Sequence, residues 1–396
     1  MQRRKVRDCS DNRDVISLFS GAMGLDIGLS QAGLRVRACQ DLDPDCVATM
    51  GLNGHDAIQG DIRGIAPERI LGAAGLKRGE PFLVCGGPPC QPFSTAGRRR
   101  GISDPRGSLF MDFLRMLDHM RPRFFIMENV KGLLSQQADE GFSPKGRTGG
   151  KARPESPLVS ALGIILSQFE KLGYKTVHGV LDAVNYGVPQ FRERFVLMGS
   201  RDGEDIFLPL PTHFQRHQNP AFRWVTLRDA IADLEGDPGE CAAFKEERLA
   251  LLRLVPEGGN WRSLPSDCVE GAMGGAYRSG GGKVGFYRRL SYDEPSPTLV
   301  TSPVQKASML CHPVLDRPLG VREYSRLQQF PGNWRLHGGT SSKYRQLGNA
   351  VPVGLARALG EALLATANGD STVRSKRCRG TDAHRRMVWP PRAAVG

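Results

Sequence analysis

Short apolar runs alternate with amphipathic stretches over the first 200 residues of the chain. Runs rich in β-branched and aromatic residues predict strands, and apolar residues spaced by three and four predict helices between them. The predicted strands are residues 15–19, 36–40, 82–85, 124–127 and 195–198. The predicted helices are residues 25–32, 45–52, 67–74, 109–120 and 158–172. This alternation predicts an α/β fold whose mostly parallel sheet is covered by helices on both faces.

The regular pattern stops after the last predicted strand. Residues 201–342 are rich in Pro, Gly and Arg, and they predict a second, smaller domain. A helical pattern returns at 352–367, so residues 14–200 are expected to form the large domain together with residues 343–368. The remaining residues, 369–396, are expected to form a basic, disordered tail.

Composition narrows the classes of protein that fit. The chain of 396 residues is 40% hydrophobic, which is typical of a globular protein with two or three domains. A formal net charge of +13 indicates an anionic partner, although residues 371–396 hold seven basic residues against one acid, as a solvated tail also does. No apolar run is long enough to cross a membrane, and residues 1–14 lack the apolar stretch of a secretory signal. Nine cysteines without a C-x-x-C pair favour a reducing compartment, with neither a disulfide framework nor a metal site.

The loops that follow the strands are where ligands bind in such sheets. Gly21 and Gly24, after the first strand, permit a tight turn and a close approach of the backbone to a ligand. Asp41, about 20 residues further on, suits a ribose diol, and Asp61 suits an adenine amino group. These loops predict an adenosine-containing cofactor, and the absence of G-x-G-x-x-G argues against a nicotinamide. By itself the glycine turn is equally consistent with a purely structural role.

Two neighbouring strand ends carry groups that could act together in catalysis. Cys90 follows two prolines and could be a nucleophile, or it could be a small buried hydrophobic residue. Glu128 ends the next strand and could supply a proton across the same cleft. Arg192 and Arg194 point to one face of an extended segment, where they could bind an anion or a carbonyl, or line a solvated strand edge.

These loops, in this order, resemble the DNA (cytosine-5) methyltransferases of bacteria. The resemblance runs from about residue 14 to 368, and Met23 departs from it, because the family has a small residue there. The matching motifs are Phe19-Ser-Gly, Asp41, Asp61, Pro88-Pro-Cys-Gln91, Glu128-Asn-Val130, Gln190-x-Arg-x-Arg194 and Gln346-Leu-Gly-Asn-Ala-Val351. The set of Pro-Pro-Cys-Gln, Glu-Asn-Val and Gln-x-Arg-x-Arg is highly specific.

The resemblance implies a Rossmann-like sheet that binds S-adenosylmethionine, and a covalent reaction on cytosine. Cys90 would add to C6 of the base while Glu128 protonates N3. Arg194 would bind O2, with Arg192 supporting the same face. C5 would then take the methyl group, and loss of the C5 proton with departure of Cys90 would end the cycle.

The resemblance also assigns residues to the cofactor. Phe19 and Leu42 would pack on the adenine, Asp41 would hold the ribose and Asp61 the adenine amino group. Because Asn349 and Ala350 would close the methionine end, the last helix must fold back onto the first domain. The other expected cofactor contacts are Ser20, Gly21, Gly24, Leu25, Ile62, Pro89 and Leu109.

The implied substrate is double-stranded DNA with the target cytosine flipped out of the helix. The segment 91–107, with Ser94, Arg98, Arg99 and Arg100, is expected to close over the DNA. Residues 201–342 would read the target sequence, with Arg278 as one candidate contact, and residues 289–299 would order that domain. The family leads us to expect a cytoplasmic, nucleoid-associated monomer. A cognate restriction endonuclease acting separately is an expectation from the family only.

Three alternatives remain at this point. A relative could methylate cytosine in RNA, and comparison of duplex DNA with structured RNA as the methyl acceptor separates the two. A DNA-binding protein that has lost activity would have no need of Cys90 together with Glu128. A nicotinamide-dependent oxidoreductase is disfavoured by the spacing of the glycines.

Overall fold

The computed structural model describes residues 12–89, 109–130, 161–215, 218–280 and 283–370. Three sequence-based expectations lie outside these residues: Cys90, the arginine-bearing segment 91–107, and residues 371–396 of the basic tail.

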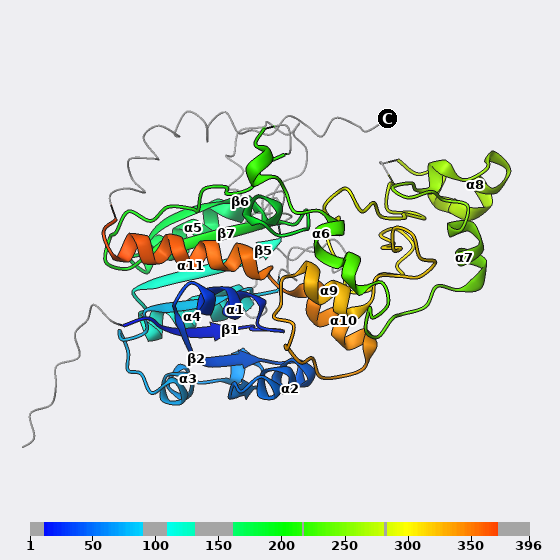
Figure 1. Ribbon diagram of the computed structural model, residues 1–396. Coiled ribbons are helices and arrows are strands. Elements are labelled where there is room, and N and C mark those ends of the chain that lie inside the picture. The colour runs from blue at the N-terminus through cyan, green and yellow to red at the C-terminus, as the bar shows by residue number, and fades with distance from the viewer. Residues whose placement is uncertain (1–11, 90–108, 131–160, 216–217, 281–282, 371–396) are drawn as a thin grey trace, which may run out of the picture.

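A seven-stranded sheet is formed by strands between Asp14 and Ser200 (Figure 1). Its strand order is β3-β2-β1-β4-β5-β7-β6. The first five strands in this order pair in parallel, whereas β7 runs antiparallel to both β5 and β6. The strands are β1 (Asp14–Leu18), β2 (Arg35–Asp41), β3 (Ala57–Gln59), β4 (Leu83–Gly86), β5 (Phe124–Val130), β6 (Lys175–Asp182) and β7 (Glu193–Ser200). The predicted α/β fold with a mostly parallel sheet is confirmed.

Helices cover both faces of the sheet, as predicted. One apolar cluster joins Ile16 and Val84 of the sheet to α3, α4 and α5, and another joins Val15 and Cys85 to α1 and α11. Neighbouring side chains on β1, such as Val15 and Ile16, point to opposite faces of the sheet, so each belongs to a different apolar cluster. The helices of this domain are α1 (Gly24–Gln31), α2 (Pro44–Leu52), α3 (Pro67–Ala74), α4 (Leu109–Met120), α5 (Ala161–Lys171), α10 (Thr340–Asn349) and α11 (Val353–Ala367).

Two strands, β3 and β6, were not predicted from the sequence. β3 has three residues, which is too short for a recognisable alternation of apolar and polar side chains. β6 lies at the edge of the sheet, and of its eight residues only Leu181 is buried. An edge strand that buries so little carries no continuous apolar run, and the sequence signal for it is correspondingly weak.

The last helix packs directly against the first. A Cβ atom on Gly28 of α1 would lie 2.4 Å from Cβ of Ala356, and one on Gly360 would lie 2.7 Å from Cβ of Ala32. This confirms that the C-terminal helix folds back onto the first domain. Residues Thr340–Ala367 are apolar enough, by length and composition, to cross a membrane, but 61% of the most apolar window is buried. The stretch is also divided into α10 and α11 before Val353, so it belongs to the protein core.

Residues 201–342 consist mainly of loops with short helices, and Figure 1 shows α7 and α8 farthest from the sheet. They have a small core of their own, which includes Phe244, Leu252 and Met309. Buried Arg289 donates hydrogen bonds to the carbonyls of Leu252 and Val255, as expected of a segment that orders this region. The helices are α6 (Leu227–Ile231), α7 (Glu246–Leu252), α8 (Ser266–Met273) and α9 (Val321–Leu327).

The two regions also share a core. Met23 and Met50 from the first residues of the chain pack in one cluster with Leu227, Tyr324 and Leu347. The predicted boundary between residues 342 and 343 falls inside α10, which contributes to this cluster. The division into domains therefore stays a prediction, since part of residues 201–342 packs on the large domain.

Substitution of Gly28 by Ala tests the contact between α1 and α11. The added methyl group would lie 2.4 Å from the Val353 carbonyl oxygen as well as from Ala356, so we expect a loss of about 1–3 kcal/mol in the free energy of unfolding. Gly51→Ala is the matched control, because this glycine is also helical but has no atom within 4 Å of the added position. Urea denaturation measures both, and equal stability of the two variants would contradict the close contact.

Candidate active site

A cavity of about 480 Å³ opens at the carboxyl ends of the parallel strands. Its size is typical of a site for a small molecule. Every predicted catalytic or cofactor-binding residue that the structure describes lines it. These are Phe19, Ser20, Gly21, Gly24, Leu25, Asp41, Leu42, Asp61, Ile62, Pro89, Leu109, Glu128, Arg192, Arg194, Asn349 and Ala350. Residues from both ends of the chain are therefore brought together at one site.

The loop after β1 is built from left-handed backbone. Phe19, Gly21 and Met23 have φ angles of 55°, 56° and 71°. No atom lies within 4 Å of a Cβ on Gly21, so its conformation alone favours glycine there. Gly24 differs, because a Cβ on it would lie 2.2 Å from the Val351 carbonyl oxygen. The sequence predicted that the backbone at Gly24 approaches a ligand closely. In the structure, the backbone at Gly24 closely approaches Val351, in the segment before α11.

Met23 does not line the cavity, although it departs from the family motif. Its side chain is 1% exposed and packs in the core shared with α2 and α10. The large residue points away from the cavity wall and leaves the turn in place.

Asp41 holds the first two loops together. One carboxylate oxygen accepts from the backbone N–H of Gly21 at 2.8 Å, and the other accepts from that of Asp43 at 2.9 Å. Burial raises the pKa of Asp41, while these backbone donors oppose the rise. A carboxylate oxygen can accept more than one hydrogen bond, so both can still receive a hydroxyl from the cavity.

Asp61 is committed to its neighbour Arg63. Its carboxylate accepts from Nε of Arg63 at 2.9 Å and from the backbone N–H of Arg63 at 3.0 Å. This arginine lowers the pKa of Asp61 and keeps the group ionised. Binding of an adenine amino group by Asp61 stays a prediction. The amino group would have to donate to lone pairs of the carboxylate that Arg63 does not use.

An apolar wall faces these acids. Leu42 is 62% exposed and Val130 is 48% exposed, yet both line the cavity, together with Phe19, Ile62 and Leu109. Large exposed apolar side chains gathered around polar groups are typical of a site that covers a flat, partly apolar ligand.

Glu128 and Arg194 form a buried ion pair in the cavity wall. Oε1 of Glu128 lies 2.6 Å from Nε of Arg194, and the two side chains are 11% and 10% exposed. Burial raises the pKa of Glu128, and the positive charges of Arg194 and Arg192 act against it. Burial therefore shifts the carboxyl group toward its protonated form, and the two arginines oppose that shift.

The loop that leads to Cys90 is anchored beside this pair. A Cβ on Gly87 would lie 2.9 Å from Oε2 of Glu128, so only glycine fits against the carboxylate. Nδ2 of Asn129 donates to the carbonyl of Pro88 at 3.1 Å, which ties the loop after β4 to β5. Cys90 itself lies outside the described residues. In the described part of the loop, Gly87 lies against Glu128, and two prolines separate Gly87 from Cys90.

Arg192 lies deeper than the sequence suggested. It is 1% exposed, and it donates to the backbone carbonyls of Leu299 at 2.9 Å and Gly348 at 2.6 Å. Gln328 adds a further bond from its side chain to the carbonyl of Leu347. These bonds fix the turn that presents Asn349 and Ala350 to the cavity. The expectation that Arg192 supports Arg194 in binding O2 of the base stays a prediction.

Sequence reasoning missed several polar residues of the cavity wall. Gln40, buried on β2, accepts from the backbone of Phe19 at 3.4 Å and donates to Gly60 at 2.7 Å, so it links three strand ends. Arg345 pairs with Asp43 at 2.7 Å. Asp26 also lines the cavity. A polar residue in a buried strand and an acid in the first turn after the glycine loop are the signals that could have found Gln40 and Asp26.

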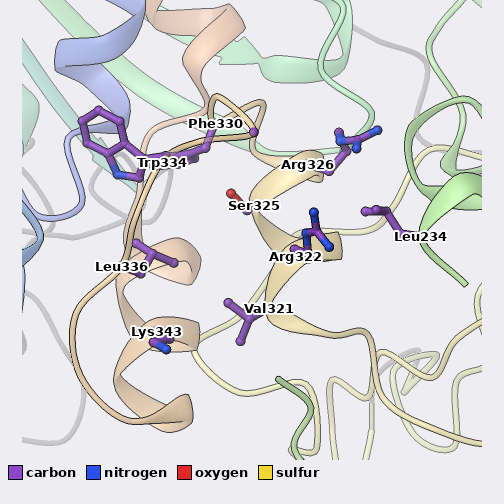
Figure 2. Close-up of a pocket in the computed structure, with 10 residues that line it drawn as sticks. Leu234, Val321, Arg322, Ser325, Arg326, Phe330, Trp334, Leu336 and Lys343 are labelled. Carbon is purple, nitrogen blue, oxygen red and sulfur yellow. The ribbon is translucent and has the colours of Figure 1, made fainter. Parts of the chain in front are cut away.

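A second cavity, of about 160 Å³, lies between α9, the start of α10 and the loop bearing Trp334 (Figure 2). Its cations are already paired: Arg322 with Asp237, Arg326 with Asp233, and Lys343 with Glu240. The remaining lining residues are Leu234, Val321, Ser325, Phe330, Gly332, Trp334 and Leu336. None of the predicted site residues lines it, and we assign it no catalytic role.

Comparison with known proteins identifies the family. The family model described as C-5 cytosine-specific DNA methylase matches residues 13–365. The chain belongs to the C-5 cytosine-specific DNA methylase family. The chain is therefore an enzyme, a DNA (cytosine-5) methyltransferase.

Curated relatives of this methylase cover most of the chain. The type II methyltransferase M.PspPI of Psychrobacter sp. is 36% identical over 367 residues, which are 91% of this chain and 80% of that protein. The type II methyltransferase M.Sau96I of Staphylococcus aureus is 36% identical over 370 residues, 91% of this chain and 78% of that protein.

Solved structures share the fold of the methylase. A DNMT2 variant of Spodoptera frugiperda aligns with a TM-score of 0.58 at 15% identity, covering 89% of this chain and 99% of that one. The Dnmt2 methyltransferase of S. pombe gives 0.54 at 19% identity, covering 89% and 98%. At these identities the likeness establishes the fold alone.

Substitution of Arg192 by Met tests whether this residue holds the turn before α11. Two buried carbonyls would lose their donor, and we expect the free energy of unfolding to fall by about 2–4 kcal/mol. Arg357→Met is the control, because Arg357 is exposed on α11 and its ion pair with Glu361 spans 3.7 Å. Urea denaturation measures both variants. A loss for Arg192→Met no larger than that of the control would contradict the role.

Proposed function

We propose that this methylase transfers the methyl group of S-adenosylmethionine to C5 of a flipped-out cytosine within a specific DNA sequence, as part of a restriction–modification system. The main support is the Glu128–Arg194 pair in the wall of the same cavity as Asp41. A site for a base edge and a site for a ribose thus adjoin one another, as transfer between cofactor and base requires.

The cavity fits S-adenosylmethionine. When bound, this cofactor supplies a methyl group activated by a positively charged sulfur. Asp41 would accept hydrogen bonds from the ribose hydroxyls with the lone pairs that Gly21 and Asp43 leave open. Leu42 and Phe19 would cover the adenine ring, and Asn349 with Ala350 would enclose the methionine end.

Glu128 and Arg194 would bind the cytosine edge. Arg194 donates to O2 of the base, and Glu128 donates a proton to N3, which requires that its carboxyl group be protonated. The raised pKa of Glu128 favours that form, since burial penalises the carboxylate. The pair would separate or shift to admit the base, because Oε1 of Glu128 now accepts from Arg194 at 2.6 Å.

Cys90 would be the nucleophile. Its thiolate sulfur would form a bond to C6 while N3 takes the proton from Glu128, and C5 would become electron-rich enough to accept the methyl group, with S-adenosylhomocysteine as the leaving group. Loss of the C5 proton to a base, cleavage of the bond between sulfur and C6, and return of the N3 proton to Glu128 would then restore the aromatic ring, the cysteine thiolate and the protonated carboxyl group. The support is positional: in the loop that leads to Cys90, Gly87 lies against the Glu128 carboxylate, and the carbonyl of Pro88 accepts a hydrogen bond from Asn129.

The DNA sequence around the target base would be read by residues 201–342. Arg278 there has a side chain that is 85% exposed, and it pairs with Glu270 at 2.7 Å, a contact that DNA could replace. The type II methyltransferase relatives support a role in restriction–modification. In this proposal a cognate endonuclease would act separately. We further propose that the enzyme acts as a monomer in the cytoplasm.

The function is tested by giving the full-length protein and tritiated S-adenosylmethionine either duplex DNA or structured RNA. We expect incorporation into duplex DNA only, and bisulfite sequencing should place the methylated cytosines in one short sequence. Cys90→Ser should transfer no methyl group but retain DNA binding, because the nucleophile alone is lost. Incorporation into RNA, a random pattern in DNA, or robust turnover by Cys90→Ser would each contradict part of the proposal.

Substitution of Glu128 by Gln tests the proton donor. The amide can still occupy the site but cannot protonate N3, so we expect the single-turnover rate of methyl transfer to fall about 10²–10⁴-fold. The control is Glu193→Gln, an exposed residue next to Arg194 on β7, which should leave the rate unchanged. An unchanged rate in Glu128→Gln would remove this residue from the chemistry.

A further inference from the structure

Gln40 is a buried polar residue of the cavity wall, and its side chain bonds to the backbone of two different loops. It lies near the end of β2, is 1% exposed and lines the cavity. Nε2 donates to the carbonyl of Gly60 at 2.7 Å, and Oε1 accepts from the backbone N–H of Phe19 at 3.4 Å. Because β2 lies between β1 and β3 in the sheet, one amide group reaches the loops on both sides. The two ends of the amide cannot be exchanged, since Gly60 offers an acceptor and Phe19 a donor.

The two residues that Gln40 holds have unusual backbone conformations. Phe19 has a φ angle of 55° and Gly60 has one of 150°, both in the range that residues with a side chain rarely adopt. A residue such as Phe19 keeps a left-handed conformation only where its surroundings impose it. The side chain of Gln40 therefore fixes the backbone at two points where the local preference of the chain does not.

These two points adjoin the groups proposed to bind adenine. The aromatic ring that would cover the adenine belongs to Phe19 itself, and Asp61, which would accept from the adenine amino group, directly follows Gly60. Since neighbouring strands lie about 4.8 Å apart, β1 and β3 are separated by roughly 10 Å. The position of one loop relative to the other is thus set by the groups that connect them across β2.

The other bonds of the loop after β3 do not connect it to the loop after β1. The backbone of β2 adds one bond, from the N–H of Gly60 at 3.1 Å. On the far side of Asp61, Arg115 of α4 donates to the carbonyl of Ile62 at 2.6 Å. Within the described part of the chain, Gln40 is therefore the side chain that joins the two loops by hydrogen bonds.

We propose that Gln40 is a positioning residue for adenine recognition. Its bonds to the two loops hold the ring of Phe19 and the carboxylate of Asp61 in the relative position that adenine requires. Gln40 acts through these loops, because both ends of its amide are engaged by backbone groups. The inference rests on the proposed function, since the adenine is that of S-adenosylmethionine.

The test compares two ligands by isothermal titration calorimetry of the full-length protein. One is S-adenosylhomocysteine, and the other is its analogue with purine in place of adenine, which lacks only the amino group. The wild-type protein should bind S-adenosylhomocysteine about tenfold more tightly, because the amino group donates to a charged acceptor. Gln40→Met keeps the length of the side chain without its amide. This variant should abolish the preference, since the Asp61 carboxylate is no longer held in place.

Gln59→Met is the matched control. Gln59 is exposed on β3 and lies outside the cavity lining, so the same substitution there should keep the preference. Asp61→Ala should abolish the preference, and Gln40→Met should not change it further in that background, because the two residues act through one contact. If Gln40→Met does not fold, Gln40→Asn takes its place, since the shorter amide cannot bond to both loops.

A folded Gln40→Met variant that keeps the full preference would contradict the proposal, even if both ligands bind more weakly, because a purely structural role weakens both alike. Absence of the preference in the wild-type protein would also contradict it. A further change in preference when Gln40→Met is added to Asp61→Ala would indicate direct contact of Gln40 with the amino group and would overturn the positioning role. Failure of the wild-type protein to bind S-adenosylhomocysteine would instead contradict the proposed cofactor.

Discussion

The site depends on one tight contact between segments from opposite ends of the chain. α1 and α11 approach so closely that side chains at Gly24, Gly28 and Gly360 would overlap Val351, Ala356 and Ala32. This contact sets the turn before α11 against the glycine loop after β1. A small change of volume between the two helices would be transmitted to the cavity, because packed helices have little free space in which to adjust. The glycines on this interface are thus as much part of the site as the acids that line it.

The direction of β7 is the second constraint on the site. β7 runs antiparallel to β5, and Arg194 near its start is paired with Val130 at the end of β5. A parallel strand in that position would begin at the opposite edge of the sheet and carry Arg194 away from Glu128. Reversal of one strand therefore brings a cation to the edge where the parallel strands end, and it allows a buried ion pair to form between strand neighbours.

Much of the fold and most of the cavity lining could be predicted from the sequence. Buried strands and amphipathic helices leave a strong periodic signal, and the set of Pro-Pro-Cys-Gln, Glu-Asn-Val and Gln-x-Arg-x-Arg is highly specific to one family. β3 and β6 were not predicted, because β3 is only three residues long and β6 is an edge strand with few buried side chains. The true partners of Gly24 and Arg192 are backbone carbonyls of remote segments, Val351 and Gly348, and no local pattern encodes such contacts. Asp26 escaped for a different reason, since an acid early in a helix is ordinarily explained by the helix dipole.

The late position of the turn before α11 has a consequence for synthesis of the protein. Asn349 and Ala350 line the cavity, yet they follow the other strands and loops of the site by more than a hundred residues. While residues 201–342 are being translated, the nascent polypeptide already contains the acids of the pocket, Arg192 and Arg194, but not the residues that close it. Premature termination before this turn would release a product with Cys90 and Glu128 but an open pocket. The cavity can therefore close only after this turn has been synthesised.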